Sequence, residues 1–121
     1  AFVSASGVHS SELDPDAAGR GVKLAPLARA ARRFRVVGDC IQHGLVCRGR
    51  LHVAVDAIMQ PWDTAAMVPC LREAGGVAAS LEGDEAGVVF SGSLVSASGS
   101  ALLAAALERM GTVTTPGAAG R

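Results

Sequence analysis

Apolar and polar positions along this chain follow two different periods, one typical of strands and one typical of helices. Short apolar stretches, several of them alternating with polar positions, predict strands at residues 1–6, 34–37, 51–55, 76–81 and 94–97. Apolar positions three and four residues apart predict helices at residues 24–33, 40–48, 63–74 and 100–110. Because strands alternate with helices of these lengths, the sequence predicts an α/β fold.

The longest predicted helix lies between Pro61-Trp62 and Gly75-Gly76. Asp63 is expected to cap its first turn by accepting backbone N–H groups, and the glycines are expected to end it. Pro69 has no N–H to donate, so we expect the helix to bend there. Its predicted buried face consists of residues with helical spacing, namely Met67, Cys70, Leu71 and Ala74.

Two predicted strands end next to charged residues, and ligands in α/β folds collect at the carboxyl ends of strands. The first stretch runs from Arg35 to Cys40, where we expect Asp39 to cap a helix whose buried face carries Cys40, Gly44 and Cys47. The second stretch begins with Asp56, directly after the predicted strand at residues 51–55, and continues to Asp63. The chemistry of the protein is therefore expected at these two strand ends.

Composition narrows the class of protein. The 121 residues are enough for one domain, and 50% hydrophobic with 18% charged residues excludes a disordered chain. Eleven basic and eleven acidic side chains leave no net charge, which argues against nucleic acid or an anionic membrane as a partner. There is no export signal and no apolar run of the roughly 20 residues that span a bilayer.

The cysteines and histidines form no metal-binding pattern. Cys40, Cys47 and Cys70 contain no CxxC pair, so we interpret them as buried free thiols in a reducing compartment, and we expect a cytoplasmic protein. The spacing of His9, His43 and His52 matches no zinc pattern, and we expect structural or surface roles for them.

The chain is expected to be a fragment of a larger fold. It begins with Ala, and a strand pattern starts at once. We interpret residues 1–110 as one α/β domain and residues 111–121, which show no periodicity, as a flexible tail.

Several segments together resemble a known family. Trp62-Asp63-x-Ala65-Ala66, followed by Glu73-Ala74-Gly75-Gly76, resembles the second signature of the inositol monophosphatase-like family of magnesium-dependent phosphatases. Arg35-x-x-Gly38 is similar to the family's Arg-x-x-Gly segment, which lines the substrate pocket. The likeness runs from about residue 1 to about residue 110 and corresponds to the carboxyl-terminal half of a layered α/β sandwich with a mixed sheet.

The residues at positions 38–40 and 56 resemble those of the histidinol-phosphatase branch of that family. Gly38-Asp39-Cys40 and Asp56 fit this branch, whereas the inositol branch more often has Gly-Thr or Gly-Ser at the first two positions and Glu at position 56. The resemblance implies Mg²⁺-dependent hydrolysis of a phosphate monoester, with L-histidinol phosphate of histidine biosynthesis as the leading substrate. It implies Asp63 as a metal ligand and Arg35, Gly38, Asp39 and Asp56 as the leaving-alcohol pocket. It also implies a homodimer in the intact enzyme.

One family feature is missing from the chain. Asp14-Pro15-Asp16 departs from the family's first signature, Asp-Pro-x-Asp-Gly-Thr, because its second Asp comes one place early and no Gly-Thr follows. We interpret it as a turn with Pro15 at its first corner. That signature and an upstream Glu supply most of the family's metal ligands, and one carboxylate cannot hold a two-metal site.

We therefore expect the 121 residues to lack an amino-terminal half of the fold and to be inactive alone. Two alternatives stay open: an inositol-1-phosphate phosphatase, or a truncated non-catalytic module in which Asp63 is only a helix cap.

Overall fold

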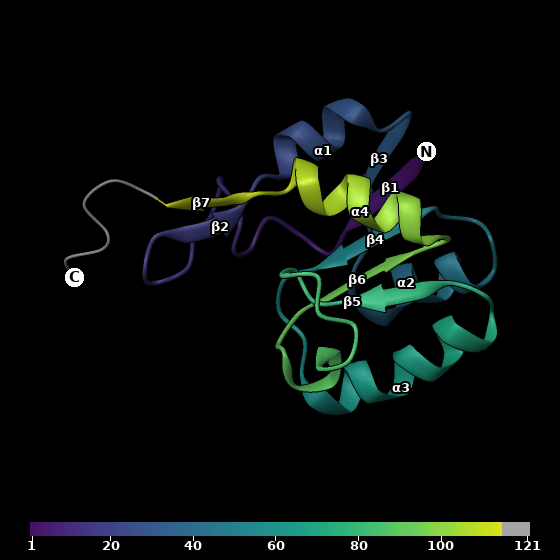
Figure 1. Ribbon diagram of the computed structural model, residues 1–121. Coiled ribbons are helices and arrows are strands. Elements are labelled where there is room, and N and C mark those ends of the chain that lie inside the picture. The colour runs from purple at the N-terminus through teal and green to yellow at the C-terminus, as the bar shows by residue number, and fades with distance from the viewer. Residues whose placement is uncertain (115–121) are drawn as a thin grey trace.

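A computed structural model describes the backbone of residues 1–114 and the side chains of residues 1–111. A five-stranded mixed sheet is covered by α1 and α4 on one face and by α2 and α3 on the other (Figure 1). This confirms the predicted α/β class. The elements in chain order are β1 (Phe2–Ala5), β2 (Arg20–Val22), α1 (Leu24–Ala30), β3 (Arg33–Val36), α2 (Asp39–Cys47), β4 (Val53–Asp56), α3 (Pro61–Glu73), β5 (Val77–Ala79), the 3-10 helix η1 (Val88–Phe90), β6 (Leu94–Ala97), α4 (Ser100–Arg109) and β7 (Thr112–Thr114).

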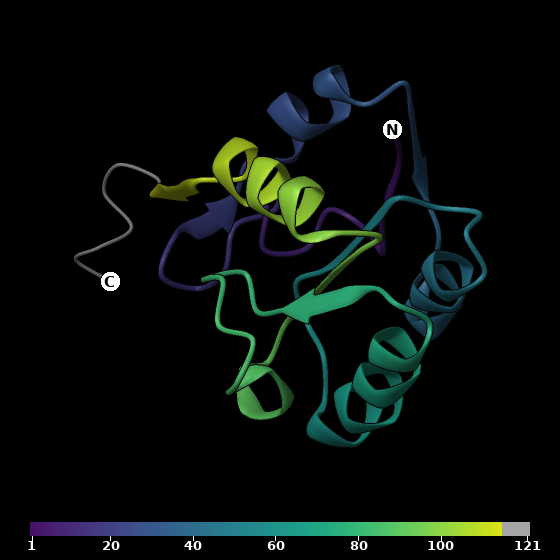
Figure 2. The same cartoon turned by 45° about the vertical axis from the view of Figure 1, so that its right-hand side comes forward.

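The order of strands in the sheet is β3-β1-β4-β6-β5. β3, β1 and β4 are parallel, whereas β6 runs antiparallel to both of its neighbours. The carboxyl ends of the three parallel strands therefore meet at one edge of the sheet, which we call the carboxyl edge. α2 and α3 follow β3 and β4 in the chain, so both helices begin at this edge and lie side by side along one face (Figure 2).

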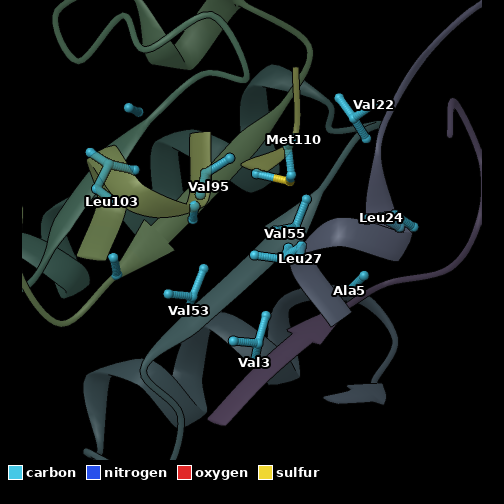
Figure 3. Close-up of a cluster of buried hydrophobic side chains, with 13 residues drawn as sticks. Val3, Ala5, Val22, Leu24, Leu27, Val53, Val55, Val95, Leu103 and Met110 are labelled. Atoms are coloured by element: carbon cyan, nitrogen blue, oxygen red, sulfur yellow. The ribbon is translucent and has the colours of Figure 1, made fainter. Parts of the chain in front are cut away.

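Alternation along each strand divides the apolar residues between two cores. The core under α1 and α4 is built from valines and alanines of the sheet and from leucines of the two helices (Figure 3). In the core under α2 and α3, the sheet contributes fewer buried residues than in the first core, namely Ala54, Ala78 and Leu94. Val53 and Val55 point to the first core and Ala54 to the second, so Asp56 belongs to the face covered by α2 and α3.

The predicted buried faces of α2 and α3 were wrong in part. On α2 the fully covered residues are Gln42, His43 and Val46 rather than Cys40, Gly44 and Cys47. On α3 they are Thr64, Val68 and Leu71, while Cys70 and Ala74 are exposed. Hydrophobic spacing failed here because buried polar side chains with hydrogen-bond partners occupy core positions.

The predicted caps were also wrong. Gly38 and Gln60 are the N-cap residues of α2 and α3, and neither Asp39 nor Asp63 makes a side-chain cap. Pro61 is the first residue of α3, a position that needs no N–H partner, which moves Asp63 to third place. α3 continues through Pro69 to Glu73.

Two loop predictions need correction. The turn lies at Asp16–Gly19, one residue beyond Pro15, because the Asp16 carboxylate accepts the N–H groups of Ala18 and Arg20, both at 2.9 Å. Residues 112–114, predicted as part of a flexible tail, form β7, which pairs with β2, and residues 115–121 lie outside the described residues. Within residues 1–114, no helix has the length and apolar character needed to cross a membrane.

Candidate functional site

A cavity of about 250 Å³ lies at the carboxyl edge. It contains two of the five predicted site residues, Asp39 and Asp56, which come from different elements. Asp39 is the first residue of α2 and Asp56 is the last residue of β4. The complete lining is Ser6, His9, Asp39, Asp56, Ala57 and Ile58.

Asp56 is the buried acid of this cavity, with 5% of its surface exposed. Its Oδ1 accepts hydrogen bonds from Ser6 Oγ at 3.1 Å and from the N–H of Ile58 at 3.3 Å. Within residues 1–111, its Oδ2 accepts none. One carboxylate oxygen is thus anchored to the protein, and the other keeps its capacity to accept hydrogen bonds.

Burial raises the pKa of Asp56, and the negative charges of Asp39 and Asp63 raise it further. The two hydrogen bonds to Oδ1 act in the opposite direction. Burial, followed by the charges of Asp63, Asp56 and Asp39, also raises the pKa of the Cys40 thiol. The three aspartates are therefore close enough to interact electrostatically, and the carboxyl edge has a negative potential that favours a cationic group.

Asp39 has an unusual backbone conformation. Its φ of 56° lies in the left-handed region, which Asp tolerates better than most residues. Asp39 has this conformation at the start of α2, where the chain changes direction between β3 and the helix. Asp39 itself is exposed at the mouth of the cavity.

Asp63 alone does not make a metal centre. It is half-buried in the first turn of α3, its N–H donates to the carbonyl of Gln60 at 3.0 Å, and its carboxylate type suits Mg²⁺. However, no group of three or more His, Cys, Asp or Glu side chains within the described part of the chain could hold a metal ion. These residues therefore offer fewer than three such ligands at any one point, and no reaction step can be derived through a metal from them.

The structure does not bring Arg35 and Gly38 into the cavity lining. Arg35 is exposed on the edge strand β3, level with Ser4 of β1. Gly38 is the N-cap of α2 with an ordinary φ of −69°, and a Cβ there would meet nothing within 4 Å among the described residues. Neither conformation nor packing within residues 1–111 therefore requires glycine at position 38.

Sequence reasoning missed Ser6, His9 and Ile58. Ser6 follows β1 and lies level with Asp56 because Ala5 pairs with Val55. His9 lies at the rim, where its Nδ1 is 3.2 Å from Asp14 Oδ2. A polar residue at the end of the first strand was a usable signal, but the neighbour of that strand could not be inferred from the sequence.

A second cavity of about 290 Å³ adjoins the first through Ala57. Its ionisable lining residues are Asp16, Arg20 and Glu82, and Arg20 Nε already lies 3.4 Å from Asp16 Oδ2. We take the smaller cavity as the candidate site because it contains the buried acid and two predicted residues.

Comparison with known proteins identifies the family. The sequence profile of the inositol monophosphatase family matches residues 3–113. A histidinol-phosphatase from Chlorobaculum parvum is 62% identical over 39 residues, which are 32% of this chain and 15% of that protein.

Solved structures share the fold. An inositol monophosphatase from Zymomonas mobilis superimposes with a TM-score of 0.74 at 21% identity, over 90% of this chain and 41% of that one. An IMPase/NADP phosphatase complexed with Mg²⁺ and phosphate gives a TM-score of 0.68 at 17% identity, over 90% of this chain and 38% of that one. This chain thus spans about two fifths of the length of these relatives. Because the family profile covers nearly all of it, the chain belongs to the inositol monophosphatase family.

Proposed function

We propose that this chain is part of a cytoplasmic, Mg²⁺-dependent phosphatase that hydrolyses L-histidinol phosphate to histidinol. Membership of the inositol monophosphatase family supports phosphate monoester hydrolysis. The short segment shared with a histidinol-phosphatase supports this substrate. Free thiols at Cys40, Cys47 and Cys70 suit a reducing compartment.

The observation that carries the choice of substrate is the buried Asp56 in an acidic cavity, with one carboxylate oxygen that accepts no hydrogen bond from residues 1–111. Histidinol phosphate carries an ammonium and an imidazole, whereas inositol phosphate carries neutral hydroxyls at the corresponding distance from the ester. A hydrogen bond between ammonium and carboxylate contributes about 1.5–3 kcal/mol. It would also relieve the repulsion that Asp39 and Asp63 impose on Asp56.

In this proposal the cavity holds the leaving alcohol. Asp56 Oδ2 accepts from the substrate ammonium, and Asp39 adds a second negative charge at the mouth. Arg35 of β3 and Gly38, which do not line this cavity, would contact the substrate only beyond it. Asp63 contributes one carboxylate to a Mg²⁺ site, and the other ligands come from outside the described residues. The relative solved with Mg²⁺ and phosphate supports this choice of metal.

The test is a comparison of two substrates with the complete gene product. We expect a higher kcat/KM for L-histidinol phosphate than for inositol-1-phosphate, loss of turnover with EDTA, and recovery with Mg²⁺. A preference for inositol-1-phosphate would replace the proposal with the inositol branch. Turnover of neither ester would overturn the proposal and leave the non-catalytic module as the alternative.

A further inference from the structure

A layer of small residues crosses the sheet beneath α2. The strand registers place Ser4 of β1, Ala54 of β4, Ser96 of β6 and Ala78 of β5 in one row, and all four are buried. Small side chains let α2 approach the sheet closely. The helix places Gln42 and His43, each fully buried, over this row.

Gln42 uses both ends of its amide. Its Oε1 accepts a hydrogen bond from Ser4 Oγ at 2.7 Å, and its Nε2 donates to the carbonyl oxygen of Val55 at 2.9 Å. That carbonyl also accepts the N–H of Ser6 at 3.0 Å. Such buried hydrogen bonds fix the depth and register of the helix on the sheet, because leaving either end unpaired is costly.

These contacts lead directly to the cavity. Ser4 comes two residues before Ser6, Val55 comes directly before Asp56, and Gln42 comes one helical turn after Asp39. Ser6, Asp39 and Asp56 line the cavity, whereas Gln42 does not. A single side chain outside the cavity therefore joins the three chain segments that supply these polar lining groups.

We propose that Gln42 is a positioning residue, which sets the separation of Asp39 and Asp56 across the cavity by tying α2 to β1 and β4. Its effect on turnover rests on the proposed function, but its effect on the cavity does not. Reacting groups displaced by about 1 Å can lose about a hundredfold in rate, so loss of both amide contacts is expected to matter.

The same layer provides a matched control. His43 Nδ1 lies 2.7 Å from Ser96 Oγ. This contact matches the Gln42–Ser4 contact in length and burial, and it also joins α2 to the sheet. It reaches β6, which supplies no residue to the cavity lining. Ser96→Ala therefore removes an equivalent buried hydrogen bond between α2 and the sheet, on a strand that pairs with β4 but supplies no residue to the cavity lining.

The experiment compares Gln42→Leu, Ser4→Ala and Ser96→Ala in the complete gene product. The first readout is kcat/KM for L-histidinol phosphate at a temperature where every variant is folded. The second is hydrogen exchange of two amides, those of Ser6, which donates to Val55, and Ile58, which donates to Asp56. The exchange readout needs no catalysis, and Ser4→Ala keeps the test valid if Gln42→Leu does not fold.

We expect Gln42→Leu to lose about ten- to a hundredfold in kcat/KM, and Ser4→Ala to lose less. Both should accelerate exchange at Ser6 and Ile58, whereas Ser96→Ala should leave kcat/KM and both exchange rates near the parent values. Equal effects of the Ser4 and Ser96 variants, or unchanged exchange in the Gln42 variant, would overturn the inference. If the parent hydrolyses no phosphate ester, the proposed function fails and the exchange data alone decide the role of Gln42.

Discussion

The buried imidazole of His43 predicts a loss of stability in mild acid. Its Nδ1 contacts Ser96 Oγ, while Nε2 is buried without a hydrogen-bond partner within residues 1–111. Burial lowers the pKa of His43 from 6.5 to about 4. Between these two values the unfolded chain binds a proton that the folded chain does not, so the free energy of unfolding falls as the pH falls.

The size of the effect follows from the two pKa values. Each unit of difference corresponds to about 1.4 kcal/mol, so His43 should cost roughly 2.5 kcal/mol between about pH 7 and about pH 4.5. Asp56 acts with the opposite sign: its pKa is raised in the folded state, so protonation at low pH favours folding. A variant at position 43 keeps the Asp56 contribution and therefore isolates that of the imidazole.

The assay is urea unfolding of the parent and of His43→Gln across this pH range. Gln has a similar reach, can hydrogen-bond to Ser96, and does not titrate. We expect the parent to lose roughly 2.5 kcal/mol more than the variant on going from about pH 7 to about pH 4.5. Parallel pH dependences of the two proteins would show that His43 does not titrate as its burial requires.

Three further predictions concern the carboxyl edge. Asp56→Asn keeps an acceptor for Ser6 and Ile58 but removes a buried charge, so it should raise the melting temperature at neutral pH. In enzyme assays it should lower kcat/KM for histidinol phosphate about ten- to a hundredfold, and equal losses on inositol phosphate would contradict the substrate proposal. Asp63→Asn removes no cap, so the melting temperature should stay within a few degrees while activity collapses; near-parental activity would exclude a metal role. The purified 121-residue chain should show no Mg²⁺-dependent turnover of histidinol phosphate, and robust turnover would require a metal site that its described residues do not form.

Much of the fold could be predicted because apolar periodicity reports burial directly. β6 was predicted with its observed bounds, and the helix predicted at residues 100–110 corresponds to α4, whose buried residues Leu103 and Ala106 have helical spacing. The faces of α2 and α3 could not be predicted in the same way. Gln42, His43 and Thr64 are fully buried polar residues. The partners of Gln42 and His43, Ser4 and Ser96, are far away in sequence, whereas Thr64 donates to the carbonyl of Gln60 one turn earlier.

Part of the candidate site could be predicted from a single rule about where ligands bind in α/β folds. The carboxyl ends of strands in an α/β sheet collect ligands, and this rule pointed to the two strand ends that carry Asp39 and Asp56, which the structure brings to one cavity. It could not show that Ser6 would be level with Asp56, because strand order is not readable from periodicity. It also included Arg35, which lies on an outer strand away from the cavity.

The three aspartates of the carboxyl edge illustrate how a fold can hold like charges together. Asp39 and Asp63 lie in the first turns of α2 and α3, where the positive ends of two helix dipoles favour negative charge. Asp56 is the last residue of a strand instead, and burial with two neighbouring charges raises its pKa. Its ionised form is therefore disfavoured by its surroundings, although Ser6 and Ile58 donate to one oxygen. A cationic ligand on the other oxygen would remove much of this cost, so the same burial that destabilises the free carboxylate favours the bound complex.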